Sequence, residues 1–171
     1  IYDDTALTKN EYTISHHKGE KPIVDIDEFT IFITGSITDC GEAENDFIYS
    51  IIRDYRDVSS NYEVTQTKGK LVVTKRPVTL TTKSKTFIYN GRYNSFAEFD
   101  IISGSFVSGH NYSAVNYVGI RDVGTVSNDM DIMVTKYDEI NGQMVETSEN
   151  YDISFVNNGT LTVNKRQITI T

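Results

Sequence analysis

The sequence predicts a mainly β protein that consists of two small modules in tandem. The first observation is an internal repeat: residues 69–81 and 159–171 share the pattern Gly-x-Leu-x-Val-x-Lys-Arg-x-(Val/Ile)-Thr-(Leu/Ile)-Thr. The second is that apolar and polar residues alternate along both copies, with many β-branched types, as is typical of half-buried strands. The third is that no segment has a convincing helical period. We expect two-layer modules, each an Ig-like sandwich or a β-grasp-like sheet with at most one short helix.

Length and charge limit the functions to consider. The chain of 171 residues is long enough for one or two domains, and the repeat favours two. The formal net charge of -8 would repel phosphate groups, so we expect no nucleic-acid partner. No apolar run is long enough for a membrane-spanning helix. The chain starts at Ile1 without a signal peptide, which we interpret as a segment of a longer protein.

The first module begins with runs of strand-forming residues. Residues 1–4 align with residues 88–91, where Asn90-Gly91 is a strong turn signal, so we expect each segment to end a strand in a tight turn. Further runs are rich in β-branched and aromatic residues, and a polar loop at residues 16–22 separates them. The expected strands are residues 12–14, 23–26 and 29–34.

A shared Asp-x-Gly-x-x-x-Asn-Asp pattern, at residues 39–46 and 122–129, aligns the middle of the two copies. It places Cys40 at the position of Val123, so we expect a buried thiol that acts as a small hydrophobe. Because Cys40 is the only cysteine, an internal disulfide and a thiolate zinc site are excluded. The strand that follows in each copy should point alternate side chains into equivalent cores. These side chains are Phe47, Tyr49, Ile51, Met130, Ile132 and Val134.

Each module is expected to close with a hairpin. In the first module residues 61–64 would pair with residues 69–73, and in the second residues 150–155 would pair with residues 159–163. The side chains expected to share one face of the first hairpin are Tyr62, Val64, Leu71 and Val73.

The repeat predicts a first module at residues 1–75, a second at residues 76–165 and, at residues 166–171, a terminal strand that would open a third. This division follows from the hypothesis that residues 78–80 begin the second module, in which case the first module lacks its opening strand ahead of Ile1. The alternative is that residues 78–80 end the module before them. No flexible spacer separates the modules, so the joint should be stiff.

These motifs resemble the MBG-type repeat domains of bacterial surface proteins and adhesins. The resemblance rests on Asn61-Tyr62, on the motif at residues 69–81, on Ile88-Tyr89-Asn90-Gly91 and on the Asp-x-Gly of residues 122–124. It covers essentially the whole chain. The first copy departs from the family pattern at Asp3-Asp4, where the glycine of the turn is missing.

The resemblance implies a repeated, non-enzymatic module with no cofactor and no catalytic residues. Such repeats occur in tandem along exported or cell-wall-attached chains of Gram-positive bacteria, which implies an extracellular, cell-surface location with attachment through parts outside this segment. We expect a monomeric stalk or spacer that contributes to adhesion. Two alternatives stay open: a module that binds a host glycan or host protein, and an accessory domain of a secreted hydrolase.

Acidic residues supply weak candidates for a metal site. Asp129 and Asp131 lie two residues apart, so they could share one strand face and offer oxygen ligands to calcium. No segment matches a calcium-binding loop with its glycine and terminal glutamate, so a solvated acidic surface is favoured. His16 and His17 would face opposite sides of a strand, which does not suit one shared metal.

Tyrosines supply weak candidates for a binding surface. Tyr89, Tyr93, Tyr112 and Tyr117 could form an aromatic patch for carbohydrate or protein. Tyrosine is also frequent in strands, where the ring packs and the hydroxyl stays in water, and that interpretation is favoured.

Overall fold

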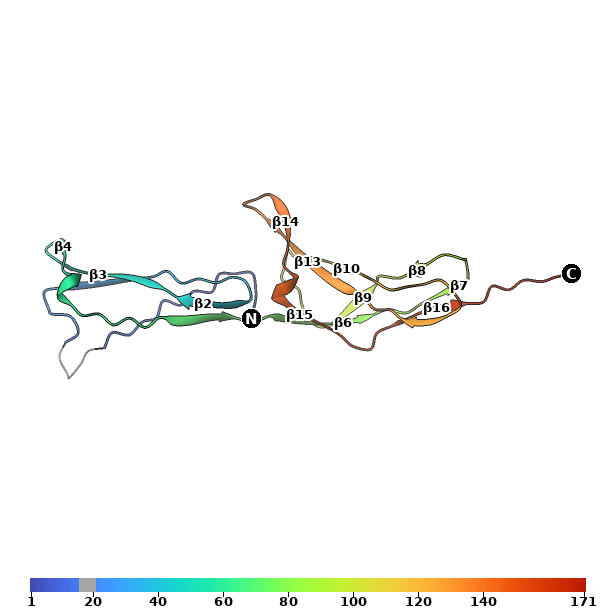
Figure 1. Ribbon diagram of the computed structural model, residues 1–171, viewed down its shortest axis with the longest axis horizontal. Helices are drawn as coiled ribbons and strands as arrows, with labels where there is room; N and C mark the ends of the chain where they lie inside the picture. The colour runs from blue at the N-terminus through green and yellow to red at the C-terminus, as the bar shows by residue number, and fades with distance from the viewer. Residues whose placement is uncertain (16–20) are drawn as a thin grey trace. The chain divides into compact units, whose positions relative to one another are not determined.

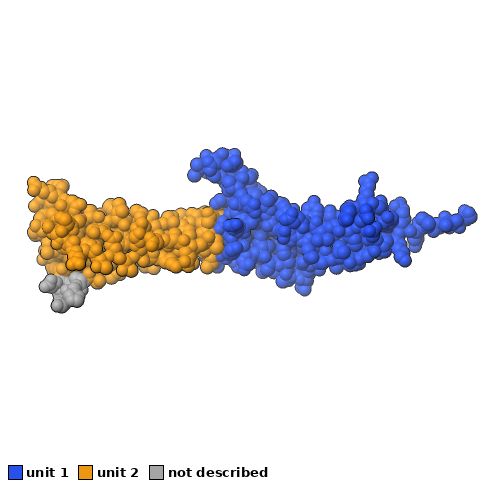
Figure 2. Space-filling view, viewed as in Figure 1, with its two compact units in different colours: residues 1, 75–171 blue, residues 2–74 orange. Residues whose placement is uncertain are grey.

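The computed structural model describes residues 1–15 and 21–171 (Figure 1). The described residues form strands and two 3₁₀ turns, and no α-helix is present among them. The predicted mainly β class, with at most one short helix in each module, is therefore confirmed. The chain divides into two compact units, coloured separately in Figure 2. In chain order, the first unit comprises residues 2–74 (orange, keyed as unit 2 in Figure 2), and the second comprises Ile1 with residues 75–171 (blue, keyed as unit 1).

The described residues of the first unit form two small antiparallel sheets. Its elements are β1 (Glu28–Ile33), β2 (Gly41–Asn45), β3 (Phe47–Arg53), β4 (Arg56–Asp57), η1 (Ser59–Asn61) and β5 (Gly69–Val73). In one sheet β3 lies between β1 and β4, and in the other β2 pairs with β5. Leu7 and Ile37 add an isolated antiparallel bridge.

The second unit contains four small sheets. Its elements up to the middle of the unit are β6 (Arg76–Thr82), β7 (Lys85–Ile88), β8 (Asn94–Ser95), β9 (Phe99–Gly104), β10 (Asn111–Val115) and β11 (Gly119–Ile120). The remaining elements are β12 (Gly124–Ser127), β13 (Asp131–Asp138), β14 (Gln143–Glu146), η2 (Ser148–Asn150), β15 (Tyr151–Phe155) and β16 (Thr160–Asn164). The strand orders are β15-β6-β9, β10-β13-β14, β12-β16-β7 and β11-β8.

β6 is the central strand of its sheet. It pairs in parallel with β15 and antiparallel with β9, so both of its edges carry ladder hydrogen bonds. Val78 and Leu80 of this strand are only 1% and 0% exposed. Because alternate side chains of a strand share one face, this buried pair is the apolar face that β6 turns to the core.

The core side chains were correctly predicted in the second unit. Met130, Ile132 and Val134 are all buried. In the first unit Ile51 is buried, whereas Phe47 and Tyr49 at the equivalent alternate positions are only half-buried. The alternation therefore holds in both copies, but the first unit covers its core less completely.

Both units share a hydrogen-bonded framework around their 3₁₀ turns. The Ser59 hydroxyl accepts a bond from the Ile51 backbone N–H at 3.0 Å, and the Ser148 hydroxyl accepts one from the Val134 N–H at 2.9 Å. In each copy this serine begins the 3₁₀ turn and the next tyrosine ends it. Matched side chains therefore fix the same turn in both units.

The turn at residues 1–4 keeps the geometry of its counterpart without the glycine. Asp4 has φ 65°, close to the φ 74° of Gly91, and aspartate is among the few residues that tolerate this region. The side-chain oxygens of Asp3 and Asn90 each accept a bond from the backbone N–H two residues on. Of the two predicted strand ends, the one at Ile88 is present as the end of β7, whereas residues 1–3 form no strand.

Several predicted strands and one burial prediction are wrong. Residues 12–14 and 23–26 form no strand, and only the third run is one, as β1. Among the described residues no strand pairs with residues 12–14, and residues 25–26 form a turn instead. Cys40 is only half-buried, because its position is the residue just before β2 rather than inside a strand.

The predicted hairpins and the terminal strand are also wrong. β5 pairs with β2 rather than with residues 61–64, and β15 and β16 lie in different sheets. Alternation identifies a strand but not its partner, and here the partners are distant in sequence. Residues 166–171 form no strand and are exposed.

Candidate functional site

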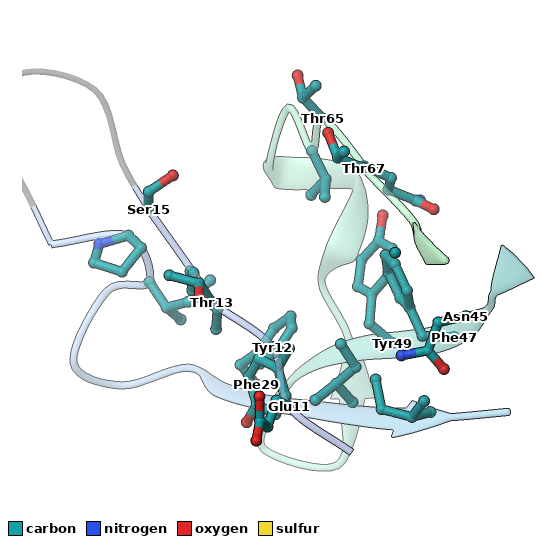
Figure 3. Close-up of a pocket in the computed structure, with 18 of the residues that line it drawn as sticks. Glu11, Tyr12, Thr13, Ser15, Phe29, Asn45, Phe47, Tyr49, Thr65 and Thr67 are labelled. Atoms are coloured by element: carbon teal, nitrogen blue, oxygen red, sulfur yellow. The ribbon is translucent and has the colours of Figure 1, made fainter. Parts of the chain in front are cut away.

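A groove of about 660 Å³ lies between two extended segments of the first unit (Figure 3). Residues 11–15 form one side and residues 62–67 form the other. The floor is one face of the sheet that β1 and β3 form. We call this the first-unit groove. The floor side chains are Phe29, Ile31, Ile33, Phe47, Tyr49 and Ile51.

The antiparallel register of β1 and β3 explains why the floor is apolar. Phe29 lies opposite Ile51, Ile31 opposite Tyr49, and Ile33 opposite Phe47, so three cross-strand pairs point to the same face. The floor is built by strand alternation alone. Of its six side chains only one is fully buried, so the rest offer apolar surface to an occupant of the groove.

The sides of the first-unit groove are extended but belong to no sheet. Residues 11–15 and 62–67 have no strand ladder. Tyr12, Ile14 and Val64 on these sides are exposed large hydrophobic residues. The Tyr12 ring lies 6.3 Å from the Phe29 ring, between centroids, which joins one side to the floor. Each side therefore presents backbone N–H and C=O groups with which an added β-strand could pair, and apolar side chains against which it could pack.

A charge cluster around the Asp27 side chain anchors the side that starts at Tyr62. Arg53 Nε and Nη2 donate to the two oxygens of Asp27 at 2.5 and 2.9 Å, and the Tyr62 hydroxyl donates to the same carboxylate at 2.5 Å. The Asp27 side chain is fully buried. The bonds from Arg53 and then from Tyr62 lower the pKa of Asp27, and the bond to Asp27 raises the pKa of Tyr62. The carboxylate thus stays ionised and holds Tyr62 in place.

Asn45, at one end of the groove, has fewer partners than its counterpart Asn128. Asn128 Nδ2 donates to the carbonyl oxygens of Lys83 and Phe96 at 2.8 and 2.9 Å. Asn45 Nδ2 donates to the Lys9 carbonyl at 2.8 Å, and this is its one partner among the described residues. Lys83 is the residue just after β6. The first unit therefore lacks the contact that the end of β6 makes in the second.

In the second unit, β6 occupies the position that corresponds to the first-unit groove. Repeat alignment matches residues 62–66 to β15 and residues 12–14 to the beginning of β9, and β6 lies between β15 and β9. No described strand of the first unit occupies that position. The groove is therefore the space that a central strand fills in the other copy.

The calcium candidates are engaged in hydrogen bonds within the chain. Asp129 accepts bonds from the Ser127 hydroxyl at 2.6 Å and from Asn158 Nδ2 at 2.8 Å, and these bonds lower its pKa. Asp131 accepts one from Asn116 Nδ2 at 3.1 Å. Among the described residues no three His, Cys, Asp or Glu side chains are grouped so that they could hold a metal ion. His16 and His17 lie outside the described residues.

The four tyrosine candidates make no ring contact with one another. The Tyr112 ring stacks on Phe106 with centroids 4.2 Å apart, and its centroid lies 6.2 Å from that of the Phe99 ring. Tyr93 is 76% exposed, and the Arg121 guanidinium lies 5.6 Å from its ring centroid. Tyr89 and Tyr117 are exposed at separate places, after β7 and between β10 and β11.

Comparison with protein-family models, with curated proteins and with solved structures found no match to this chain. No helix among the residues described has the length and apolar character needed to cross a membrane. The candidate site therefore depends on geometry alone.

The first-unit groove suits an extended peptide. Its apolar floor would receive alternate side chains, and the backbone groups of its two sides would receive ladder hydrogen bonds. Sequence reasoning did not predict the groove. The available signal was the repeat alignment, which matches the two sides of the groove to the neighbours of β6.

Proposed function

We propose that the chain is a tandem pair of non-enzymatic structural repeats from an exported bacterial surface protein, and that it acts as a stalk or spacer. The matched framework of the two units carries the proposal. Ser59 and Ser148 fix equivalent turns, and Asn45 and Asn128 occupy equivalent buried positions. In both units these polar side chains stabilise the local fold, as a repeated structural module requires.

The resemblance of the repeat motif to MBG-type domains supports the extracellular, cell-surface part of this proposal. The direct connection between the units supports the spacer part, because β5 ends at Val73 and β6 begins at Arg76. So short a connection restricts the orientations that two units can adopt, and restricted orientation lets a spacer keep its reach.

Pulsed electron paramagnetic resonance tests the spacer role. Spin labels at the exposed Ser36 and Ser113 would place one label on each unit, in a chain carrying Cys40→Ala so that no other thiol reacts. We expect one narrow distribution of label-to-label distances. A matched control inserts a Gly-Ser linker between Thr74 and Lys75 and should broaden the distribution. A distribution that is already as broad without the linker would contradict the proposal.

A further inference from the structure

The second unit contains three Asn-Gly pairs that differ in their hydrogen bonds. They are Asn90-Gly91, Asn141-Gly142 and Asn158-Gly159, and the asparagine of each pair is exposed. An asparagine that precedes a glycine can lose its side-chain amide, because the glycine nitrogen can attack the asparagine Cγ atom and glycine has no Cβ atom to hinder the approach. Since all three asparagines are exposed, the hydrogen bonds of each pair decide which one reacts.

Two of the three glycine nitrogens are engaged in backbone hydrogen bonds. The Gly142 N–H donates to the Asp138 carbonyl oxygen at 2.8 Å. The Gly159 N–H donates to the carbonyl and hydroxyl oxygens of Thr82 at 3.0 and 2.9 Å. The Gly91 N–H makes no hydrogen bond to any residue that the structure describes. A nitrogen must give up such a bond before it can attack, so of the three only Gly91 is ready to act as a nucleophile.

The surroundings of the Asn90 side chain also favour the attack. Asn90 Oδ1 accepts bonds from the Arg92 N–H at 2.9 Å and from Asn94 Nδ2 at 3.3 Å. Attack on Cγ places negative charge on this oxygen, and the two donors stabilise that charge as an oxyanion hole does. The side-chain amides of the other two asparagines instead donate to the carboxylates of Asp138 and Asp129, whose charge opposes a developing anion.

We propose that Asn90 is a site of spontaneous deamidation in the folded protein. The Gly91 nitrogen gives its proton to hydroxide and forms a bond to Asn90 Cγ, and the side-chain nitrogen takes a proton from water and leaves as ammonia. Water then opens the cyclic imide at either carbonyl carbon, which leaves aspartate or isoaspartate at residue 90. Water is consumed and ammonia is released, with no oxidation or reduction. This inference does not depend on the spacer role, because it concerns the chemistry of a single turn.

The equivalent turn of the first unit already contains the aspartate product. Asp3 stands at the position of Asn90 in the repeat alignment. Its Oδ1 accepts a bond from the Thr5 N–H at 3.0 Å, as Asn90 Oδ1 accepts one from the Arg92 N–H. A carboxylate can therefore hold this turn. We expect the aspartate product at residue 90 to keep the fold of the second unit.

Peptide mapping by mass spectrometry, after incubation of the folded chain at mildly alkaline pH, measures the rate at each pair. Each event exchanges an NH₂ group for OH and raises the mass of its peptide accordingly. Asn90 should deamidate at least about tenfold faster than Asn141 and Asn158, because no hydrogen bond of the glycine nitrogen has to break first. The matched control, Asn90→Asp, supplies the chromatographic standard for the aspartate product and should show no further mass change in this peptide.

The same incubation in guanidinium chloride tests whether the fold causes the difference. In the unfolded chain the hydrogen bonds are lost, so the three rates should become similar. The proposal is overturned if Asn90 reacts no faster than the other two in the folded chain, or if the same order of rates persists in the unfolded chain. The Asn90→Asp chain should also keep the wild-type urea midpoint, and a lowered midpoint would overturn the claim that the turn accepts the product.

Discussion

Gly69 and Gly159 occupy the same position of the repeat but have different surroundings. A Cβ atom added to Gly159 would lie 2.4 Å from the Lys83 carbonyl carbon and 2.6 Å from its oxygen. A Cβ atom on Gly69 would meet nothing closer than the Asn45 Cβ, at 3.6 Å. The difference arises because the chain after β6 passes Gly159, and no described segment passes Gly69.

This contrast predicts unequal effects of the same substitution. Gly159→Ala should lower the free energy of unfolding of the second unit by about 1–3 kcal/mol, since the backbone of Lys83 would have to move. Gly69→Ala should change that of the first unit by no more than about 0.5 kcal/mol. Urea denaturation of both variants measures the two changes. Equal losses would contradict the different packing described here.

Asp27 predicts how the first unit responds to acid. The folded protein lowers the pKa of Asp27 below its ordinary value of 3.8, so the unfolded chain binds more protons as pH falls through this range. The stabilisation is complete above the ordinary pKa and is lost as pH falls through the lowered pKa. Asp27→Asn should therefore remove part of the acid-induced loss of stability, measured as the urea midpoint at a series of pH values. Asp25→Asn, which changes an exposed carboxylate nearby, is the control and should keep the wild-type acid response.

The 3₁₀ turns η1 and η2 predict matched effects in the two units. Ser59→Ala and Ser148→Ala each leave a backbone N–H of the neighbouring strand without its hydroxyl acceptor. Each variant should lose about 1 kcal/mol of stability in its own unit. Ser60→Ala, at an exposed neighbouring serine, should have little effect. If only one of the two substitutions destabilised its unit, the turns would not be equivalent.

Strand identity was predictable at the scale of elements, but strand pairing was not. Alternating apolar residues correctly indicated β1, β3, β5, β13 and β16. The same alternation suggested local hairpins, whereas β16 pairs in parallel with β7 and β15 pairs in parallel with β6. A parallel pairing needs a long connection, and no short-range sequence signal marks which distant strand completes it.

The runs at residues 12–14 and 23–26 show why composition alone overestimates strands. Residues 12–14 have a strand-like composition but belong to no strand ladder among the described residues. Intrinsic β-propensity depends on such neighbours. The groove was unpredicted for the same reason, because the composition of a segment does not show which other segments lie beside it.

The two units differ in how completely their cores are covered. Of the described residues, the buried apolar side chains of the first unit are Tyr2, Ile51, Leu71 and Val73. Those of the second unit are Val78, Leu80, Phe106, Ile120, Met130, Ile132, Val134, Tyr151, Leu161 and Val163. Because apolar burial is the main stabilising contribution, the first unit should be the less stable of the two.

Hydrogen exchange measures this difference within one molecule. At a concentration where the chain is monomeric, the slowest amides of β3 and β5 should exchange at least about tenfold faster than those of β13 and β16, because local opening costs less free energy where less apolar surface is buried. The Ser148→Ala chain is a control, since it should speed exchange in β13 and leave β3 unchanged. Equal protection of the two units would contradict the difference in burial.

The repeated motif at residues 69–81 is shared between the units, since β5 closes the first unit and β6 is the central strand of the second. The first copy of the motif therefore supplies one strand to each of the two units. Duplication or deletion of the coding DNA between two copies of this motif, in register, would add or remove one whole domain and regenerate the same junction. Recombination of this kind would change the number of domains by whole units, so every resulting chain would consist of complete domains.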